Sequence, residues 1–340
     1  MIAKKSRSSI REIFSHYRLQ TAITGILVVL WIIFTLINPK AFGNPYLYRS
    51  MLTIIPFTLI PAITLTLIII SGEIDLSFSS VMAVGALVMA LTWKALGSNF
   101  LVLGIILGLI AGLVAGLLNG VLITKIGIPS LIATIGTMFF WRGVVLVVTN
   151  GFSIPLAEFR DHPVYQLFVG RLGGVIPAQF IWAIVFVILF WVILNRHVFG
   201  ASIYYIGDNR LAAKMLGINT DRTLIILFMI HGMIAAFAGM LPTMEMATFW
   251  PQLGDIYMLK SIAAVVVGGT PITGGIGTIY GTVIGAIMLE FIETGVIAAG
   301  ATGFWIRLIH GLVIIVALSV QGILRREEIL RAVESRLSLR

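Results

Sequence analysis

Four ionisable residues near the end of the chain are spaced so that they could exchange protons. Glu290 and Glu293 are three residues apart, which places them on one face of a helix. Arg307 and His310 have the same spacing. Both pairs lie in apolar sequence, where a charge is costly unless it is paired or reaches water. The pattern leaves two interpretations, mutual neutralisation inside a helix bundle and a proton relay.

Two polar interruptions of the apolar sequence could line a pathway for a solute. Residues 71–80 read SGEIDLSFSS, and residues 245–255 read EMATFWPQLGD. The first could be a broken helix whose exposed backbone faces a polar cavity, or else a solvated turn. The second could bind a polyhydroxylated solute, or else form an interfacial aromatic belt. The candidate pathway residues are Glu73, Asp75, Ser77, Glu245, Phe249 and Trp250.

Two other ionisable residues, Arg142 and His231, also fall in apolar stretches. An arginine at such a position needs a partner or a route to water, so we expect it to form an ion pair or to extend toward the membrane surface. For the histidine we expect a hydrogen bond between helices.

The sequence contains no pattern typical of an enzyme or of a cofactor site. We find no metal-ligand spacing, nucleophile motif or cofactor fingerprint, and the chain has no Cys. The glycine-rich residues 265–282 contain no Lys or Arg, so they do not match a phosphate-binding loop. We expect no catalytic residues, no metal and no cofactor in this chain, and a membrane-embedded enzyme is the least supported function.

The elements that position these residues are predicted to be membrane-spanning helices. Hydrophobic residues make up 59% of the chain and charged residues 11%, whereas soluble domains carry about 25% charge. A helix needs about 20 apolar residues to cross a membrane. The sequence therefore predicts an all-α polytopic membrane protein with about ten spans. They are residues 19–37, 51–71, 79–95, 100–124, 130–149, 178–195, 223–247, 256–269, 277–298 and 303–320.

The positive charges predict the orientation. With the N-terminus in the cytoplasm, most Lys and Arg residues of the loops and tails fall on the cytoplasmic side, as the positive-inside rule requires. The net charge of +9 is thus a sign of topology, and we expect no nucleic-acid partner. Residues 1–18 and 322–340 are predicted cytoplasmic basic tails around a transmembrane domain of residues 19–321. The first span is too long for a cleaved signal and should remain as an anchor.

Two glycine stripes predict close helix packing. Glycine recurs every fourth residue from Gly104 to Gly120 in the fourth span and from Gly277 to Gly285 in the ninth. These spans cross the membrane in opposite directions in the predicted topology. Spans two to five and seven to ten could therefore form an inverted repeat, a plan that places a transport pathway at the repeat interface.

The long polar segment 196–222 separates the sixth and seventh spans. Within it, residues 207–219 are typical of a short surface helix, because Asp208 or Asn209 can cap it, LAAKML favours a helix and Gly217 can end it. The alternative is an ordinary interhelical loop.

Three stretches together resemble the permease subunit of ribose-type sugar ABC importers, in a family that also includes branched-chain amino acid permeases. Residues 72–77, GEIDLS, are similar to the family's G-G-I-D-L-S signature. Residues 207–219 are similar to its cytoplasmic coupling segment. Residues 262–270, IAAVVVGGT, followed by residues 274–278, GGIGT, are similar to its most recognisable run. The likeness covers nearly the whole chain.

The resemblance implies a set of partners. Two ATP-binding-cassette ATPase subunits would bind the ATP, a second copy or a related permease would complete the pathway, and an extracytoplasmic substrate-binding protein would deliver the solute. The chain would be a multi-pass protein of a bacterial or archaeal cytoplasmic (inner) membrane. The residues expected to couple it to the ATPase are Gly207, Asp208, Asn209, Ala212, Ala213, Gly217, Ile218 and Asn219.

Some residues depart from the family pattern. Glu73 stands where a second glycine is common, Ala201 where an arginine is common, and Met258 and Lys260 where acidic residues are common. The substrate therefore stays open among pentoses, hexoses, polyols, a signalling furanose and nucleosides. We expect an importer permease that works by alternating access. The alternative is an ion-coupled secondary transporter with its coupling site at Glu290, Glu293, Arg307 and His310.

Overall fold

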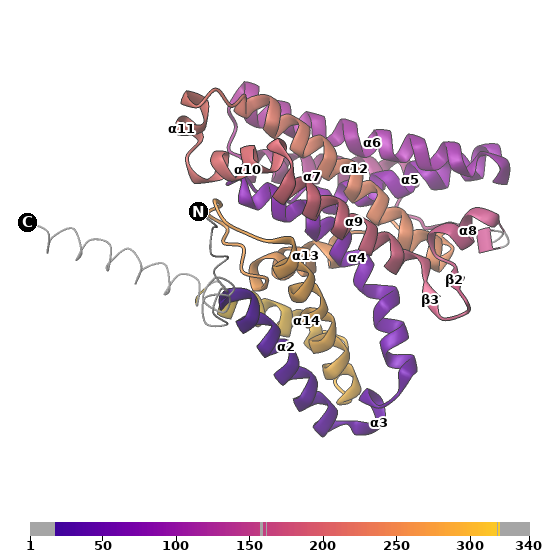
Figure 1. Cartoon of the computed structure of the whole chain (residues 1–340). Coiled ribbons are helices and arrows are strands. Elements are labelled where there is room, and N and C mark those ends of the chain that lie inside the picture. The colour runs from indigo at the N-terminus through magenta and orange to yellow at the C-terminus, as the bar shows by residue number, and fades with distance from the viewer. Residues whose placement is uncertain (1–17, 157–158, 161, 318, 320–340) are drawn as a thin grey trace, which may run out of the picture.

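The computed structural model describes residues 18–156, 159–160, 162–317 and 319, and most of that part is helical (Figure 1). The predicted basic tails lie outside the described residues, apart from Arg18. Eight helices in the described part are long and apolar enough to cross a membrane. They are α2 (Arg18–Ile37), α4 (Pro45–Ile70), α5 (Phe78–Leu96), α6 (Leu101–Val121) with the π-helical turn η2 (Leu122–Ile126), α7 (Ser130–Thr149), α9 (Ala178–Arg196), α12 (Thr220–Met246) and α14 (Ile279–Ala298).

The predicted eighth and tenth spans form shorter helices. Helix α13 (Asp255–Val267) has 13 residues, about 20 Å at about 1.5 Å per residue, and a membrane core is about 30 Å thick. The helix Phe304–Ala317 is also shorter than a full span. The all-α polytopic membrane fold is confirmed, and the count of ten spans is not.

Helix α4 forms the centre of the bundle. Its span is 94% buried, against 6% for α2, and it contacts α9, α12, α13 and α14. Around this centre α6 runs alongside α12, and α2 runs alongside α14 (Figure 1).

Both glycine stripes lie where helices touch, as predicted. A Cβ added to Gly112 of α6 would lie 2.4 Å from the carbonyl oxygen of Gly232 in α12. A Cβ added to Gly285 of α14 would lie 2.2 Å from the carbonyl oxygen of Ala264 in α13. Backbones this close leave no room for any side chain, which explains the glycine spacing.

The helix pairings are consistent with the predicted inverted repeat. If spans two to five are matched with spans seven to ten, α6 corresponds to α14, α5 to α13, and α12 to α4. Helix α6 contacts α5 and α12, while α14 contacts the corresponding helices α13 and α4. The symmetry relation itself stays a prediction.

Two helices begin beside each other inside the bundle. Between α4 and α5 the chain is not helical, and after α12 it forms β4 (Thr248–Phe249), which pairs antiparallel with β1 (Ile154–Pro155), and then turns toward α5. There Gly254 meets Ser79, since a Cβ on this glycine would lie 1.9 Å from the serine carbonyl oxygen. Helices α5 and α13 therefore start at one place.

Arg142 of α7 holds this meeting point. Its guanidinium pairs with Asp255 at 2.6 Å and donates to the carbonyl oxygens of Leu253, at 3.0 Å, and Pro251. The prediction that this arginine is paired is confirmed, and its partners are mostly backbone carbonyls that no helix satisfies.

The remaining elements lie at the two ends of the bundle. At the end where α12 begins lie α10 (Val198–Asp208) and α11 (Arg210–Met215); toward the other lie α8 (Pro163–Phe168) and an antiparallel pair of strands, β2 (Arg171–Leu172) and β3 (Ile176–Pro177) (Figure 1). Two further short helical segments are α3 (Pro39–Phe42) and η1 (Ser98–Phe100). The predicted surface helix is divided between α10 and α11 at Asn209, whose side chain caps α11 by accepting from the backbone N–H of Ala212 at 3.0 Å.

Gly112→Leu should destabilise the protein, because the new side chain would push α6 from α12 at a cost of about 3 kcal/mol. Size-exclusion chromatography after heating in detergent measures the loss of folded protein. Gly136→Leu in α7 is the matched control, since a Cβ there meets no heavy atom within 4 Å. Equal stability of the two variants would contradict this account of the stripe.

Candidate functional site

The three motifs that the sequence singled out meet at one place. A Cβ on Gly207 of α10 would lie 1.7 Å from the carbonyl oxygen of Ile70, at the end of α4. A Cβ on Gly274, in the loop before α14, would lie 2.7 Å from Cα of Gly72. The backbone N–H of Gly275 donates to the same Ile70 oxygen at 2.9 Å. We call this contact of residues 70–77, 204–210 and 270–278 the motif junction.

Local geometry explains the glycines of the motif junction. Gly72, Gly274 and Gly275 have φ values of +82°, +80° and +84°, a region that favours glycine. A side-chain hydrogen bond also connects α10 to the loop before α14, because the hydroxyl of Tyr204 donates to the carbonyl oxygen of Gly277 at 2.7 Å. Burial raises the pKa of this hydroxyl, which keeps it protonated as a donor.

Glu73 is partly buried at the motif junction, with a side chain 13% exposed, and it pairs with Arg210 of α11 at 3.3 Å. Burial raises the pKa of the Glu73 carboxyl, while a hydrogen bond with Ser130 and the charge of Arg210 act in the opposite direction. Arg210 also pairs with Asp221, in the first turn of α12, at 3.4 Å. The interpretation of Glu73 as part of a freely solvated turn does not fit these contacts.

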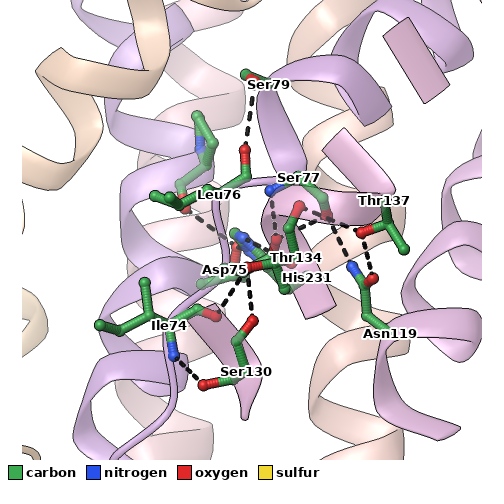
Figure 2. A network of polar contacts seen from close by, with 12 residues as sticks. Ile74, Asp75, Leu76, Ser77, Ser79, Asn119, Ser130, Thr134, Thr137 and His231 are labelled. Carbon is green, nitrogen blue, oxygen red and sulfur yellow. Dashed lines mark hydrogen bonds and ion pairs between the residues drawn. The ribbon is translucent and has the colours of Figure 1, made fainter. Parts of the chain in front are cut away.

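Asp75 lies deeper and organises a buried polar network (Figure 2). One carboxylate oxygen accepts from both the backbone N–H and the hydroxyl of Ser77, each at 2.7 Å. Asn119 of α6 donates to that hydroxyl at 2.7 Å and accepts from the hydroxyl of Thr137 in α7 at 2.6 Å. The exposed fractions of Asp75 and Ser77 are 2% and 0%, so neither faces an open pathway here.

His231 lies beside Asp75 in this network (Figure 2) and also contacts the central helix α4. Its Nδ1 is 2.7 Å from the hydroxyl oxygen of Thr64 in α4, and its Nε2 is 3.9 Å from the free oxygen of Asp75. The predicted interhelical hydrogen bond of His231 is confirmed. Five helices, α4, α5, α6, α7 and α12, thus meet around the non-helical residues 73–77.

The other candidate pathway residues form contacts of their own outside this network. Glu245 is in the last turn of α12, fourteen residues, or about 21 Å of helix, after His231. It accepts from Gln179 at 3.1 Å and pairs with Arg171 at 3.7 Å. Phe249 is fully buried, and Trp250 is partly buried. The predicted pathway residues therefore belong to two groups of contacts, one at residues 73–77 and one after α12.

The C-terminal ionisable cluster has a different membership from the predicted one. Glu290, Glu293 and His310 are brought together with Lys260 of α13, which contacts Glu293 directly. His310 Nε2 lies 3.7 Å from the same carboxylate. Arg307 is exposed and forms no ion pair within the described residues. Because a buried lysine neutralises one of the acids, the geometry favours mutual neutralisation over a relay.

The expected coupling residues differ in exposure. Asp208, Asn209, Ala212, Gly217 and Asn219 are exposed, Gly207 and Ile218 are partly buried, and Ala213 is 1% exposed. Ala213 therefore cannot present a docking face. The exposed face of this segment instead carries large apolar side chains that the sequence analysis did not select, those of Leu211, Met215 and Leu216, which are 65%, 80% and 70% exposed.

A bundle of apolar spans with non-helical segments buried inside it and a helical surface segment is typical of polytopic membrane transport proteins. The family model described as branched-chain amino acid transport system / permease component matches residues 47–318. The chain therefore belongs to this family of permease components. It is a permease subunit of the ABC transporter class, a multi-pass protein of the inner membrane.

Several curated relatives are similar over most of their length. The ribose import permease protein RbsC of Bacillus subtilis (strain 168) is 37% identical over 295 residues, 86% of this chain and 89% of the relative. RbsC of Escherichia coli (strain K12) is 32% identical over 89% and 93%. The autoinducer 2 import system permease protein LsrC of Photorhabdus luminescens is 30% identical over 78% of each chain. No solved structure matches.

Membership in this family implies separate partners. A permease component of an ABC importer works with an ATPase, which is a different subunit, and with a substrate-binding protein.

Glu73→Gln should stabilise the protein in a pH-dependent manner. Because folding raises the pKa of Glu73, its ionised form costs stability above that pKa, and the cost disappears as the pH falls toward 4.5, the ordinary pKa of a glutamate carboxyl. Melting temperatures in detergent between pH 8 and pH 4.5 should show the variant ahead at high pH and the difference closing at low pH. A constant difference, or a less stable variant at pH 8, would contradict this.

Proposed function

We propose that this chain is the transmembrane permease of an importer for a small polar solute, most consistent with a sugar, and that ATP hydrolysis on separate subunits drives it. The observation that carries the proposal is the convergence of all three motifs at the motif junction, directly behind the exposed helix α11. Relatives named for the import of ribose and of autoinducer 2 support a sugar-like solute over a branched-chain amino acid.

Helix α11 supplies the surface for an ATPase. Leu211, Met215 and Leu216 are exposed on a segment that is too polar to lie in the lipid. An exposed apolar patch on a short helix is typical of a helix that inserts into a groove of a partner. In the predicted orientation this patch faces the cytoplasm, together with both termini, where an ATPase would meet it.

Contacts behind α11 would pass its movement to the spans. Gly207 lies against the end of α4, and Tyr204 holds the loop before α14, so α10 contacts both halves of the proposed repeat. A shift of α10 and α11 would therefore change how α4 and α14 meet, as alternating access requires. Two copies of the chain, or one copy with a related permease, would form the pathway, with two ATPases beneath and a substrate-binding protein on the other side.

The ion-coupled alternative has less support. It required Glu290, Glu293, Arg307 and His310 to act together, and the exposed Arg307 stands apart from the cluster, while Lys260 takes a place in it. Uptake that persists without any ATPase and stops when the ion gradient is removed would favour that alternative.

Purification of the tagged chain from its native host in mild detergent tests the proposal. Mass spectrometry should identify an ATP-binding-cassette ATPase and a substrate-binding protein in stoichiometric amounts. Repeated recovery of the chain without an ATPase would overturn the proposal. Once the binding protein is identified, its ligand can be found by screening pentoses, hexoses, polyols and nucleosides.

Met215→Glu should reduce the co-purified ATPase on the order of tenfold, because a charge in an apolar groove costs more than the roughly 1.4 kcal/mol of a tenfold change. Leu172→Glu is the control, since Leu172 is 53% exposed on β2, toward the other end of the bundle. If both variants retain the ATPase equally, α11 is not the docking surface.

A further inference from the structure

One side chain, that of Arg210, joins three segments. It begins α11, it pairs through Nη1 with Glu73 in the loop after α4, and it pairs through Nη2 with Asp221 in the first turn of α12. The distances from these nitrogens to the carboxylate oxygens are 3.3 Å for Glu73 and 3.4 Å for Asp221. Any displacement of α11 must therefore either move Glu73 or break its ion pair.

Glu73 is attached to the buried network through its neighbours in the chain. Its backbone N–H donates to the carbonyl oxygen of Ile68 at 3.2 Å. The next residue, Ile74, donates its N–H to the hydroxyl of Ser130 in α7 at 3.1 Å and accepts at its carbonyl from Thr134. Asp75 follows, in contact with His231, and it accepts from Ser77, whose hydroxyl in turn accepts from Asn119 of α6. Glu73 is the charged residue through which α11 reaches these contacts.

The other ion pairs near α11 do not lead inward. Lys125 and Lys214 both pair with Asp221, at 3.3 and 3.8 Å, and their side chains are 59% and 52% exposed. Exposed pairs of this kind contribute little to stability. Glu73, at 13% exposure, is the most buried charge of the group.

We propose that Glu73 and Arg210 are positioning residues that transmit the movement of α11 to the non-helical residues 73–77, and through them to the buried network of Asp75. This inference rests on the proposed function of α11. The ion pair with Arg210 favours the ionised form of a carboxylate that burial disfavours, and such a buried pair can serve positioning instead of stability.

The link adds to the backbone contact between Gly207 and Ile70. The ion pair therefore strengthens a connection that backbone contacts already make. Loss of the pair should therefore weaken the coupling about fivefold, at the low end of typical coupling factors, without abolishing it.

The test uses the complete complex of permease, ATPase and binding protein, reconstituted in lipid nanodiscs. Two quantities are measured: the stimulation of ATP hydrolysis by the binding protein, and the change in hydrogen exchange of residues 72–77 when a non-hydrolysable ATP analogue binds. The variants are Glu73→Gln, Arg210→Gln and both together, with Glu73→Asp as the charge-retaining variant and Lys125→Gln as the control for the exposed ion pairs.

Each single variant should lose about fivefold in stimulation and in the exchange response, and the double variant should lose no more than either single one. Glu73→Asp should recover most of the response, and Lys125→Gln should resemble the unmodified chain. Unchanged responses in the single variants, or losses that add in the double variant, would overturn the inference while leaving the proposed function in place. An unmodified complex that does not respond to ATP would overturn both.

Discussion

The structure depends on satisfying an extended backbone and a buried carboxylate inside a membrane bundle. Backbone groups that leave a helix there have no water to bond, so protein groups must replace it. Between α4 and α5 the hydroxyls of Ser130 and Thr134 bond the N–H and carbonyl of Ile74, and Asp75 accepts from the N–H of Ser77. Without these partners residues 73–77 would have to remain helical, and neither the motif junction nor the buried network could form.

Helix α7 supplies partners for the two non-helical segments that precede α5 and α13. Ser130 and Thr134, in its first turns, hold the extended chain after α4, while Arg142, farther along, holds the carbonyls of Pro251 and Leu253 before α13. One helix therefore fixes the places where α5 and α13 begin, in both halves of the proposed repeat. A movement at the motif junction that shifts residues 73–77 would accordingly reach α7 and the region where the two helices start.

Much of the fold could be predicted because membrane spans need long apolar stretches and close helices need glycine. Side-chain partners between distant segments were less accessible. Lys260 joins Glu293 only because α13 and α14 pack in a particular rotation, which sequence spacing does not give. Ala213 is buried although it lies in a polar segment. This burial could not be predicted, because a six-residue helix is too short to show a periodic face. The shortness of α13 follows from a chain that turns back to Ser79, a path that hydropathy cannot show.

Site-specific cross-linking at Met215 tests the central claim most directly, that α11 is the surface through which a separate ATPase moves the spans. A photoreactive amino acid at this position, 80% exposed on a surface segment, would be activated in native membranes and its adducts identified by mass spectrometry. The account predicts an adduct with an ATP-binding-cassette ATPase that is absent when the same group is placed at Leu172. Adducts with lipid alone, or the same adducts from both positions, would contradict it.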